Sequence, residues 1–268
     1  MRMKSKNLSI VVLIILSVSL SAIASDDNKN KNTEEFYYKL KLGWFTLGSG
    51  KVKIEYNSMN ISGDKYHKVF AHATTLGLGN WLSNLDDKYT SVLHSKTSKS
   101  FHSYKNVKAG DSKLELWNNY DYDSMKVRVK GKDYRKEDPE VSWTVDMNDE
   151  TFDVLGTYMF FRTHDWDGMN PGDTVMIYTH YEKRLYKAGM HYQGIEKLNL
   201  NGQKIKAHKM HLLLPDQKKL KKDRPVVIWI SADEDRLPLK IYSKLFIGSA
   251  RCELHTINNE EPAFTNQP

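Results

Sequence analysis

The sequence is poor in cysteine, in long apolar runs and in net charge, and each shortage excludes a class of protein. Its 268 residues include one cysteine, Cys252, so no disulfide can form within the chain. A chain of this length is then stabilised mainly by a hydrophobic core. After Leu20 no apolar run approaches the roughly 20 residues that span a bilayer, so we predict no later transmembrane segment. The net charge of +7 is too small for the basic surface of a nucleic-acid-binding protein, and we predict no nucleic-acid partner.

The first 24 residues have the three parts of a secretory signal. Three basic side chains lie within the first six residues, an apolar run extends from Leu8 to Leu20, and Ala22 and Ala24 provide the small residues of a cleavage site. We predict cleavage after Ala24 and export of the remainder across the inner membrane. An uncleaved anchor is the alternative, and the short apolar run argues against it. Removing residues 1–24 leaves 37 basic and 33 acidic residues, a net charge of +4.

Composition predicts one domain with two loose ends. Residues 25–34 contain no apolar side chain, so we expect a disordered leader. Residues 258–268 are expected to form a loose C-terminal tail for a similar reason. Residues 35–257 contain neither a repeat of fixed period nor a low-complexity linker, and β domains of about 200–250 residues are common. We therefore predict a single β-rich domain over 35–257.

The dominant pattern in this range has a period of two residues. Val52, Ile54 and Tyr56 alternate with charged residues, and the segment 126–130 repeats the pattern. Such alternation is typical of strands with one buried face and one solvated face. Turn signals separate the strands, and we place turns at 62–64, 109–111, 118–119, 130–132 and 201–202. The pattern predicts a mainly β fold: a single curved antiparallel sheet, or a barrel-like or spiral β domain.

One segment breaks the alternation. Residues 153–162 are apolar on nearly every side, with acidic residues before them and Arg162 at their end. This charge order suits a helix dipole, and a helix that is apolar all round belongs in the interior. We predict one buried helix over 153–162.

No motif identifies a catalytic residue, a metal site or a cofactor site. There is no G-x-S-x-G elbow. The segment 48–51 lacks the first glycine and the following helix of a phosphate-binding loop. The loop 164–168 holds a histidine and two aspartates, but it lacks the further ligands of a calcium site. We predict no catalytic residue, no metal and no cofactor.

The aromatic residues are the feature that a ligand would use. Glycines at 43, 48 and 50 mark a place where the first strands could bend towards the helix. Such a bend would make Trp44, Tyr158, Phe161 and Trp229 the walls of a cavity for an apolar or amphipathic ligand. Packing of the same rings in the interior is the alternative.

Two basic features bear on the same ligand. Arg162 would either pair with Asp233 or Asp235 or meet an anionic head group, and pairing within the protein is the usual state of a buried arginine. The run Lys218–Arg224 could attract an anionic lipid or acidic glycan, or form a solvated loop.

Three segments resemble a family of exported bacterial proteins called DUF3108, a domain of unknown function. They are residues 38–50, the helix 153–162 and residues 229–240. The helix is similar to the family pattern D-x-x-S-x-x-Y-x-x-R at Asp153 and Arg162, with Gly156 where serine is common. The third segment resembles the pattern W-x-S-D-x-x-R-x-P through Trp229, Asp233, Arg236 and Pro238.

The resemblance covers residues 35–256 and implies a periplasmic protein of a Gram-negative cell, with a curved sheet around a helix. In the third segment we expect Trp229 to point inward, 233–236 to form a turn, and Pro238 to begin the next strand, where no backbone donor is needed. Lipid carriers and calycins have related shapes, so a lipid ligand enters by analogy of fold. No catalytic residue is implied.

These observations leave three functional classes open. We favour a non-enzymatic periplasmic domain that binds a lipid-like ligand in envelope biogenesis, which requires an apolar cavity of a few hundred cubic ångströms. The first alternative is a structural or interaction module at the outer membrane with an envelope protein as partner, which would show an exposed apolar patch or free sheet edge. The second is a hydrolase of envelope glycans or lipids, which would show titratable groups converging on a cleft.

Overall fold

A computed structural model describes residues 32–77, 84–110, 112–213, 226–244 and 248–262. The predicted signal peptide and most of the predicted leader lie outside these ranges, as do the run Lys218–Arg224 and the last six residues.

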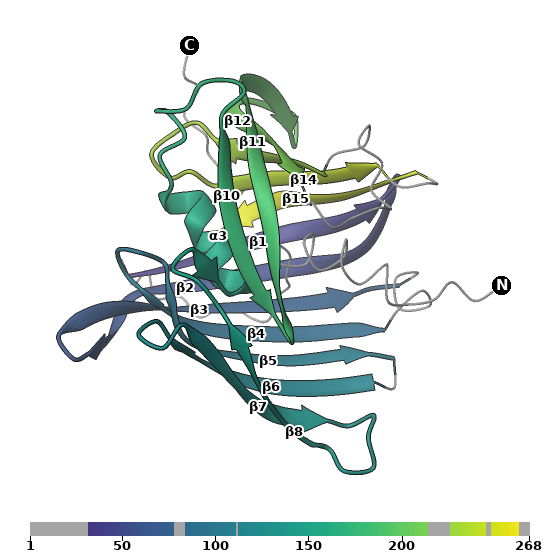
Figure 1. The fold of residues 1–268 in the computed structure, drawn as a ribbon. Coiled ribbons are helices and arrows are strands. Elements are labelled where there is room, and N and C mark those ends of the chain that lie inside the picture. The colour runs from purple at the N-terminus through teal and green to yellow at the C-terminus, as the bar shows by residue number, and fades with distance from the viewer. Residues whose placement is uncertain (1–31, 78–83, 111, 214–225, 245–247, 263–268) are drawn as a thin grey trace.

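The described residues form one 15-stranded sheet, in which the strands nearest in sequence are nearly always neighbours (Figure 1). The order across the sheet is β8-β7-β6-β5-β4-β3-β2-β1-β15-β14-β13-β12-β11-β10-β9. Among the described residues β8 and β9 do not pair, so the sheet curls without closing into a barrel. The strands are β1 (Thr33–Leu42), β2 (Phe45–Ile61), β3 (Asp64–Thr75), β4 (Leu85–His94), β5 (Ser100–Ala109), β6 (Ser112–Asp121), β7 (Lys126–Asp133), β8 (Glu140–Asp146), β9 (Thr151–Phe152), β10 (Thr174–Tyr181), β11 (Arg184–Leu200), β12 (Gln203–Leu213), β13 (Val226–Ser231), β14 (Pro238–Lys244) and β15 (Ser249–Ile257).

The predicted alternation is confirmed in the central strands. Val52 and Ile54 of β2 are fully buried, and Lys53 between them faces the opposite side of the sheet. At the predicted hairpin, β11 and β12 are joined by Asn201 and Gly202 alone, both with positive φ. That is the backbone of a two-residue type I′ turn, whose twist matches that of the flanking strands.

Two predicted turns are wrong. Residues 118–119 lie within β6, and 130–132 lie within β7. Asn118 points inward and donates to Ser103 Oγ at 2.8 Å, so a partner on β5 satisfies its amide in a strand. Gly131 is needed where β7 approaches β6, because a Cβ there would overlap the backbone carbonyl of Glu115.

The first strand also begins earlier than predicted. Thr33 and Glu34, expected in the disordered leader, pair with Glu55 and Ile54 of β2. Backbone hydrogen bonding to a neighbouring strand needs no apolar side chain, which explains why composition missed these residues. At the C-terminal end of the domain, the Asn258 backbone amide donates to Glu35 O of β1 at 2.7 Å. The first residue of the predicted loose tail is therefore hydrogen-bonded to the sheet.

The predicted buried helix is confirmed as α3 (Val154–Thr163), the one helix among the described residues. Asp153 is its N-cap, and its side chain accepts a hydrogen bond from Gly156 N at 2.6 Å. The helix packs against β3, β4 and β14 on one side and against β9 and β10 on the other. Figure 1 shows β10 and β11 crossing in front of the first strands with α3 between these two parts of the sheet. This helix is too short to cross a membrane.

Candidate functional site

The helix holds two of the predicted ligand-contacting aromatics in the core. Tyr158 and Phe161 are almost completely buried. The Tyr158 hydroxyl lies 3.1 Å from the hydroxyl of Tyr38 on β1, and burial raises the pKa of Tyr158 to about 12. These side chains fill the space between helix and sheet, which is the packing alternative of the sequence analysis.

Arg162 is paired within the protein, though with a partner that the sequence did not indicate. Its Nη1 donates to Glu34 Oε2 at 2.8 Å and to the hydroxyl of Tyr56 at 2.6 Å. The expected side-chain pairing with Asp233 or Asp235 is wrong: Arg162 Nε meets only the backbone carbonyl of Asp235, at 3.3 Å. The Arg162 guanidinium also stacks over the Phe36 ring, 4.9 Å from its centroid.

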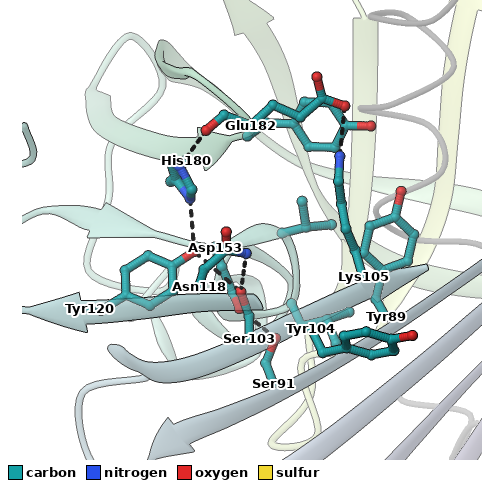
Figure 2. A pocket seen from close by; sticks show the side chains of 13 residues that line it. Tyr89, Ser91, Ser103, Tyr104, Lys105, Asn118, Tyr120, Asp153, His180 and Glu182 are labelled. Carbon is teal, nitrogen blue, oxygen red and sulfur yellow. Dashed lines mark hydrogen bonds and ion pairs between the residues drawn. The ribbon is translucent and has the colours of Figure 1, made fainter. Parts of the chain in front are cut away.

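A network of polar side chains lies beside the N-terminus of α3, inside the sheet (Figure 2). Asp153 accepts from Ser91 Oγ through Oδ2, and its own backbone amide donates to Ser100 Oγ at 3.1 Å. Burial raises the pKa of Asp153, while the hydrogen bonds from Ser91 and Gly156 act in the opposite direction. Asp153 therefore joins the helix to β4 and β5.

The network continues to the hairpin of β10 and β11. His180 Nε2 lies 2.8 Å from the carbonyl oxygen of Glu182, which can only accept, so Nε2 carries the proton. Nδ1 is then an acceptor and takes the proton of the Tyr120 hydroxyl at 2.9 Å. Burial lowers the pKa of His180 to about 4, which keeps this imidazole neutral at neutral pH.

An ion pair between a buried lysine and a partly exposed glutamate holds the tip of the same hairpin. Lys105 Nζ on β5 lies 2.7 Å from Glu182 Oε1 and 3.8 Å from the centroid of the Tyr181 ring. Burial lowers the pKa of Lys105, and Glu182 partly compensates. Asp87 on β4 is buried near this pair and accepts from Lys108 N at 3.0 Å, and burial raises its pKa to about 7.

Most of these groups, among them Asp153, His180 and Lys105, line a space of about 20 Å³. That volume holds about one water molecule, and Asn118 Oδ1, which is buried without a hydrogen-bond partner, would accept from such a water. The titratable groups bind one another and leave no room for a substrate. They join β4, β5 and β6 to α3 and the β10–β11 hairpin. Among the described residues no three potential metal ligands lie together.

Trp229 does not point inward, contrary to the sequence expectation. It alternates along β13 with the buried Ile228 and Ile230 and lies on the opposite face. There its Nε1 donates to Glu196 Oε1 at 2.6 Å, and the ammonium groups of Lys209 and Lys240 lie over its ring. Trp229 therefore does not share a cavity with Tyr158 and Phe161.

The rest of the third motif builds the connection between β13 and β14. Asp233 Oδ1 accepts from Ser231 Oγ at 2.5 Å and from Arg236 N at 3.2 Å, and Pro238 begins β14. The Arg236 guanidinium reaches Asp165 and Asp167 at 3.4 Å each, which ties this turn to the loop after α3. The motif is therefore a structural device of the fold.

Trp44 lies in the turn between β1 and β2, at one end of the sheet. Its side chain is 83% exposed and that of Phe45 is 47% exposed, with their ring centroids 5.2 Å apart. Gly43 has positive φ, and its amide donates to Ser249 O at 2.8 Å. Leu76 and Leu213 are also exposed, and the strands that lead to them, β3 and β12, end at this same end.

Sequence reasoning missed the polar network. Ser91, Lys105 and Asn118 occupy inward positions of strands, but in the sequence they resemble residues of a solvated face. The only local signal was Asp153 as the start of a helix.

Comparison with known proteins identifies a family and a fold. The family described as "Protein of unknown function (DUF3108)" matches residues 37–255. No curated protein matches the chain. The crystal structure of a β-barrel-like protein of the domain of unknown function DUF1849 from Brucella abortus is similar to it, with a TM-score of 0.54 and 9% sequence identity. The similarity covers 84% of this chain and 96% of that chain, and at this identity it concerns the fold alone.

Proposed function

This chain belongs to the DUF3108 family, which is described only as proteins of unknown function. From that premise we propose that it is an exported, non-enzymatic periplasmic domain that binds lipid at the end of its sheet that carries Trp44. Export rests on the signal-like residues 1–24, and lipid binding rests on Trp44 and Phe45. The lipid contacts this end and does not enter the interior, where the polar network leaves space for about one water molecule.

The exposure of Trp44 is the observation that carries the proposal. An indole that is 83% exposed leaves most of its apolar surface in water, next to a second aromatic ring. Isolated exposed apolar side chains are ordinary, but a group of them at one end marks a binding surface. Leu76 extends the group, and its amide donates to Leu47 O of β2 at 2.8 Å, while Leu213 is exposed at the same end four strands away from β1. Tryptophan is also enriched at the bilayer interface, because its ring is amphipathic.

The charges beside this turn suit an anionic head group. Lys41, Lys240 and Arg251 lie around the single carboxylate of Glu253, at 2.7, 3.0 and 3.9 Å. This cluster carries a surplus of two positive charges. Arg251 also donates to the carbonyl of Gly43, next to Trp44. Each cation near an anionic bilayer surface is worth about 1 kcal/mol.

Flotation of the mature protein with lipid vesicles tests the proposal. Vesicles of phosphatidylcholine alone would be compared with vesicles that also contain phosphatidylglycerol. We expect wild type to float with both and more strongly with the anionic vesicles, with a blue shift of tryptophan emission. The double variant Trp44→Ala/Phe45→Ala should lose binding by on the order of tenfold or more, equal to about 1.4 kcal/mol.

The matched control is Trp117→Ala, which removes another exposed tryptophan on a different surface and should bind as wild type does. Failure of wild type to float with either vesicle, or equal binding by the double variant, would overturn lipid binding. The export step is tested separately, because the N-terminus of protein from the periplasmic fraction should be Ser25.

A further inference from the structure

The outer face of the sheet, away from α3, carries three aromatic side chains in one row, which we call the outer aromatic row: Phe70, Tyr104 and Trp117. The register of β3 to β6 places them there, because Phe70 pairs with Thr90, Thr90 with Tyr104, and Tyr104 with Trp117. The row thus runs across four neighbouring strands, which are about 4.8 Å apart. The rings of Tyr104 and Trp117 are 5.1 Å apart, and Trp117 is 45% exposed.

Thr90 on β4 lies between Phe70 and Tyr104, and its small side chain leaves a hollow between the two rings. This shallow, open hollow has a volume of about 330 Å³, and its walls include Lys53, His72 and Lys88. The space is an order of magnitude larger than the one inside the sheet, and it is open to solvent.

Both hydrogen-bond donors and hydrogen-bond acceptors border the row. Lys53 is paired with Glu55 at 2.9 Å, and His72 is paired with Asp86 at 2.5 Å. On the same outer face Lys113 is paired with Glu115 at 2.5 Å. Lys53 and Lys113 thus have a carboxylate beside them, whereas Lys68, whose Nζ lies 4.9 Å from the centroid of the Phe70 ring, and Lys130, opposite Trp117, form no ion pair with the described residues. The surface therefore offers hydrogen-bond donors and acceptors together, with some positive charge.

This arrangement excludes several ligands. Nucleic acid requires a dense, unpaired basic surface, whereas Lys53 and Lys113 here are paired with carboxylates. A peptide strand requires a free sheet edge, whereas β3 to β6 are paired on both sides. An acyl chain requires an enclosed apolar groove, whereas this hollow is shallow and bordered by charged groups.

We propose that the outer aromatic row is a carbohydrate-binding surface. A pyranose ring has apolar C–H faces and a polar edge, so it can lie flat on Tyr104 or Trp117 while its hydroxyl groups bond the bordering ion pairs. The strand spacing is similar to the length of one sugar unit, so neighbouring sugars of an extended chain contact Tyr104 and Trp117, and Phe70 lies two strands beyond Tyr104. The surface is separate from the lipid-binding end, and this proposal does not depend on that one.

Titration calorimetry with β-1,4-linked N-acetylglucosamine tetramers, and co-sedimentation with insoluble peptidoglycan, test this assignment. We expect saturable binding by the mature wild type with a change in tryptophan fluorescence. Trp117→Ala and Tyr104→Ala should each weaken binding by on the order of tenfold. Trp44→Ala is the matched control and should leave sugar binding unchanged.

The variants should keep the circular dichroism and melting temperature of wild type, because Trp117 is half-exposed and Tyr104 is partly exposed on the outer face. Absence of saturable binding by wild type to either probe would overturn the proposal. Equal affinities of wild type and Trp117→Ala would overturn it as well. Vesicle flotation of Trp117→Ala should be normal, so the two proposals fail independently.

Discussion

Arg162, in the last turn of α3, donates to Glu34 at 2.8 Å across 128 residues of sequence. The pair joins the central helix to the first strand of the sheet. The Arg162 side chain is 9% exposed and that of Glu34 is 32% exposed, so solvent screens the carboxylate only partly. A guanidinium buried to this degree needs its partner, because an unpaired charge in the interior is costly.

Glu34→Gln should destabilise the protein. The amide keeps the shape of the side chain but removes the charge that balances Arg162. Loss of one partner of a buried pair costs about 3–5 kcal/mol, and we expect about 1–3 kcal/mol here because Tyr56 and the Asp235 carbonyl still accept from Arg162. Urea denaturation of the mature protein measures the difference.

Asp146→Asn is the control for this prediction. Asp146 pairs with Lys126 at 3.5 Å, but its side chain is 90% exposed, and such pairs contribute less than about 1 kcal/mol. If Glu34→Gln is as harmless as Asp146→Asn, then Arg162 does not depend on its pairing with Glu34.

The hydroxyls of Tyr38 and Tyr158 should show strong coupling. Each is buried and lies 3.1 Å from the other, so Tyr158→Phe leaves the Tyr38 hydroxyl without this partner. Each single Tyr→Phe change should cost about 1–3 kcal/mol. The double change should cost less than the sum of the two, because no polar atom of the pair is then left in the core. A double-mutant cycle by urea denaturation measures the coupling, and additive effects would contradict it.

The sequence predicted the strands and the helix because the signals for them lie within a few consecutive residues. Alternation in β2 is a consequence of one buried face, and Asp153 before an apolar segment is a consequence of helix capping. Neither signal depends on which other segment lies alongside.

Pairings between distant segments were not predictable in the same way. The partners of Asp153 come from β4 and β5, at sequence separations of 62 and 53 residues. Trp229 was placed on the wrong face because nearly every residue of β13 is buried, whichever face it occupies, so the strand has no alternation to read. Asn118 was assigned to a turn on residue preference, and a serine on the neighbouring strand overrides that preference.

Gly156→Ala should weaken the attachment of α3 to the sheet. A Cβ at this position would lie 2.9 Å from the backbone oxygen of Ser98 and 3.1 Å from Asp153 Oδ1. The helix or the turn between β4 and β5 must then shift, and overpacking of this kind costs about 1–3 kcal/mol. Thermal unfolding measures the loss.

Gly168→Ala is the matched control, since the nearest atom to its added Cβ is a carboxylate oxygen of the exposed Asp165, which can move. A Gly156→Ala variant as stable as Gly168→Ala would mean that the helix does not sit as closely on this turn.

Asp87 should make stability depend on pH in a direction opposite to that of most carboxylates. Burial raises its pKa from 3.8 to about 7, so between these values the folded protein binds a proton that the unfolded chain has released. The free energy of unfolding contributed by this group is therefore highest below pH 4 and falls as the pH rises from about 4 to about 7.

Asp87→Asn removes this titration and keeps an oxygen that can accept from Lys108 N. At pH 8 the variant should be more stable than wild type by about 1–3 kcal/mol, because wild type then carries a buried charge that Lys105 offsets only in part. Below about pH 4 Asp87 is protonated in both the folded and unfolded states of wild type, so this advantage should disappear. Urea denaturation at several pH values measures the difference between the two proteins, from which the other titrating groups largely cancel. A constant difference from pH 4 to pH 8, or a variant less stable than wild type at pH 8, would show that Asp87 is ionised and stabilised in the folded protein.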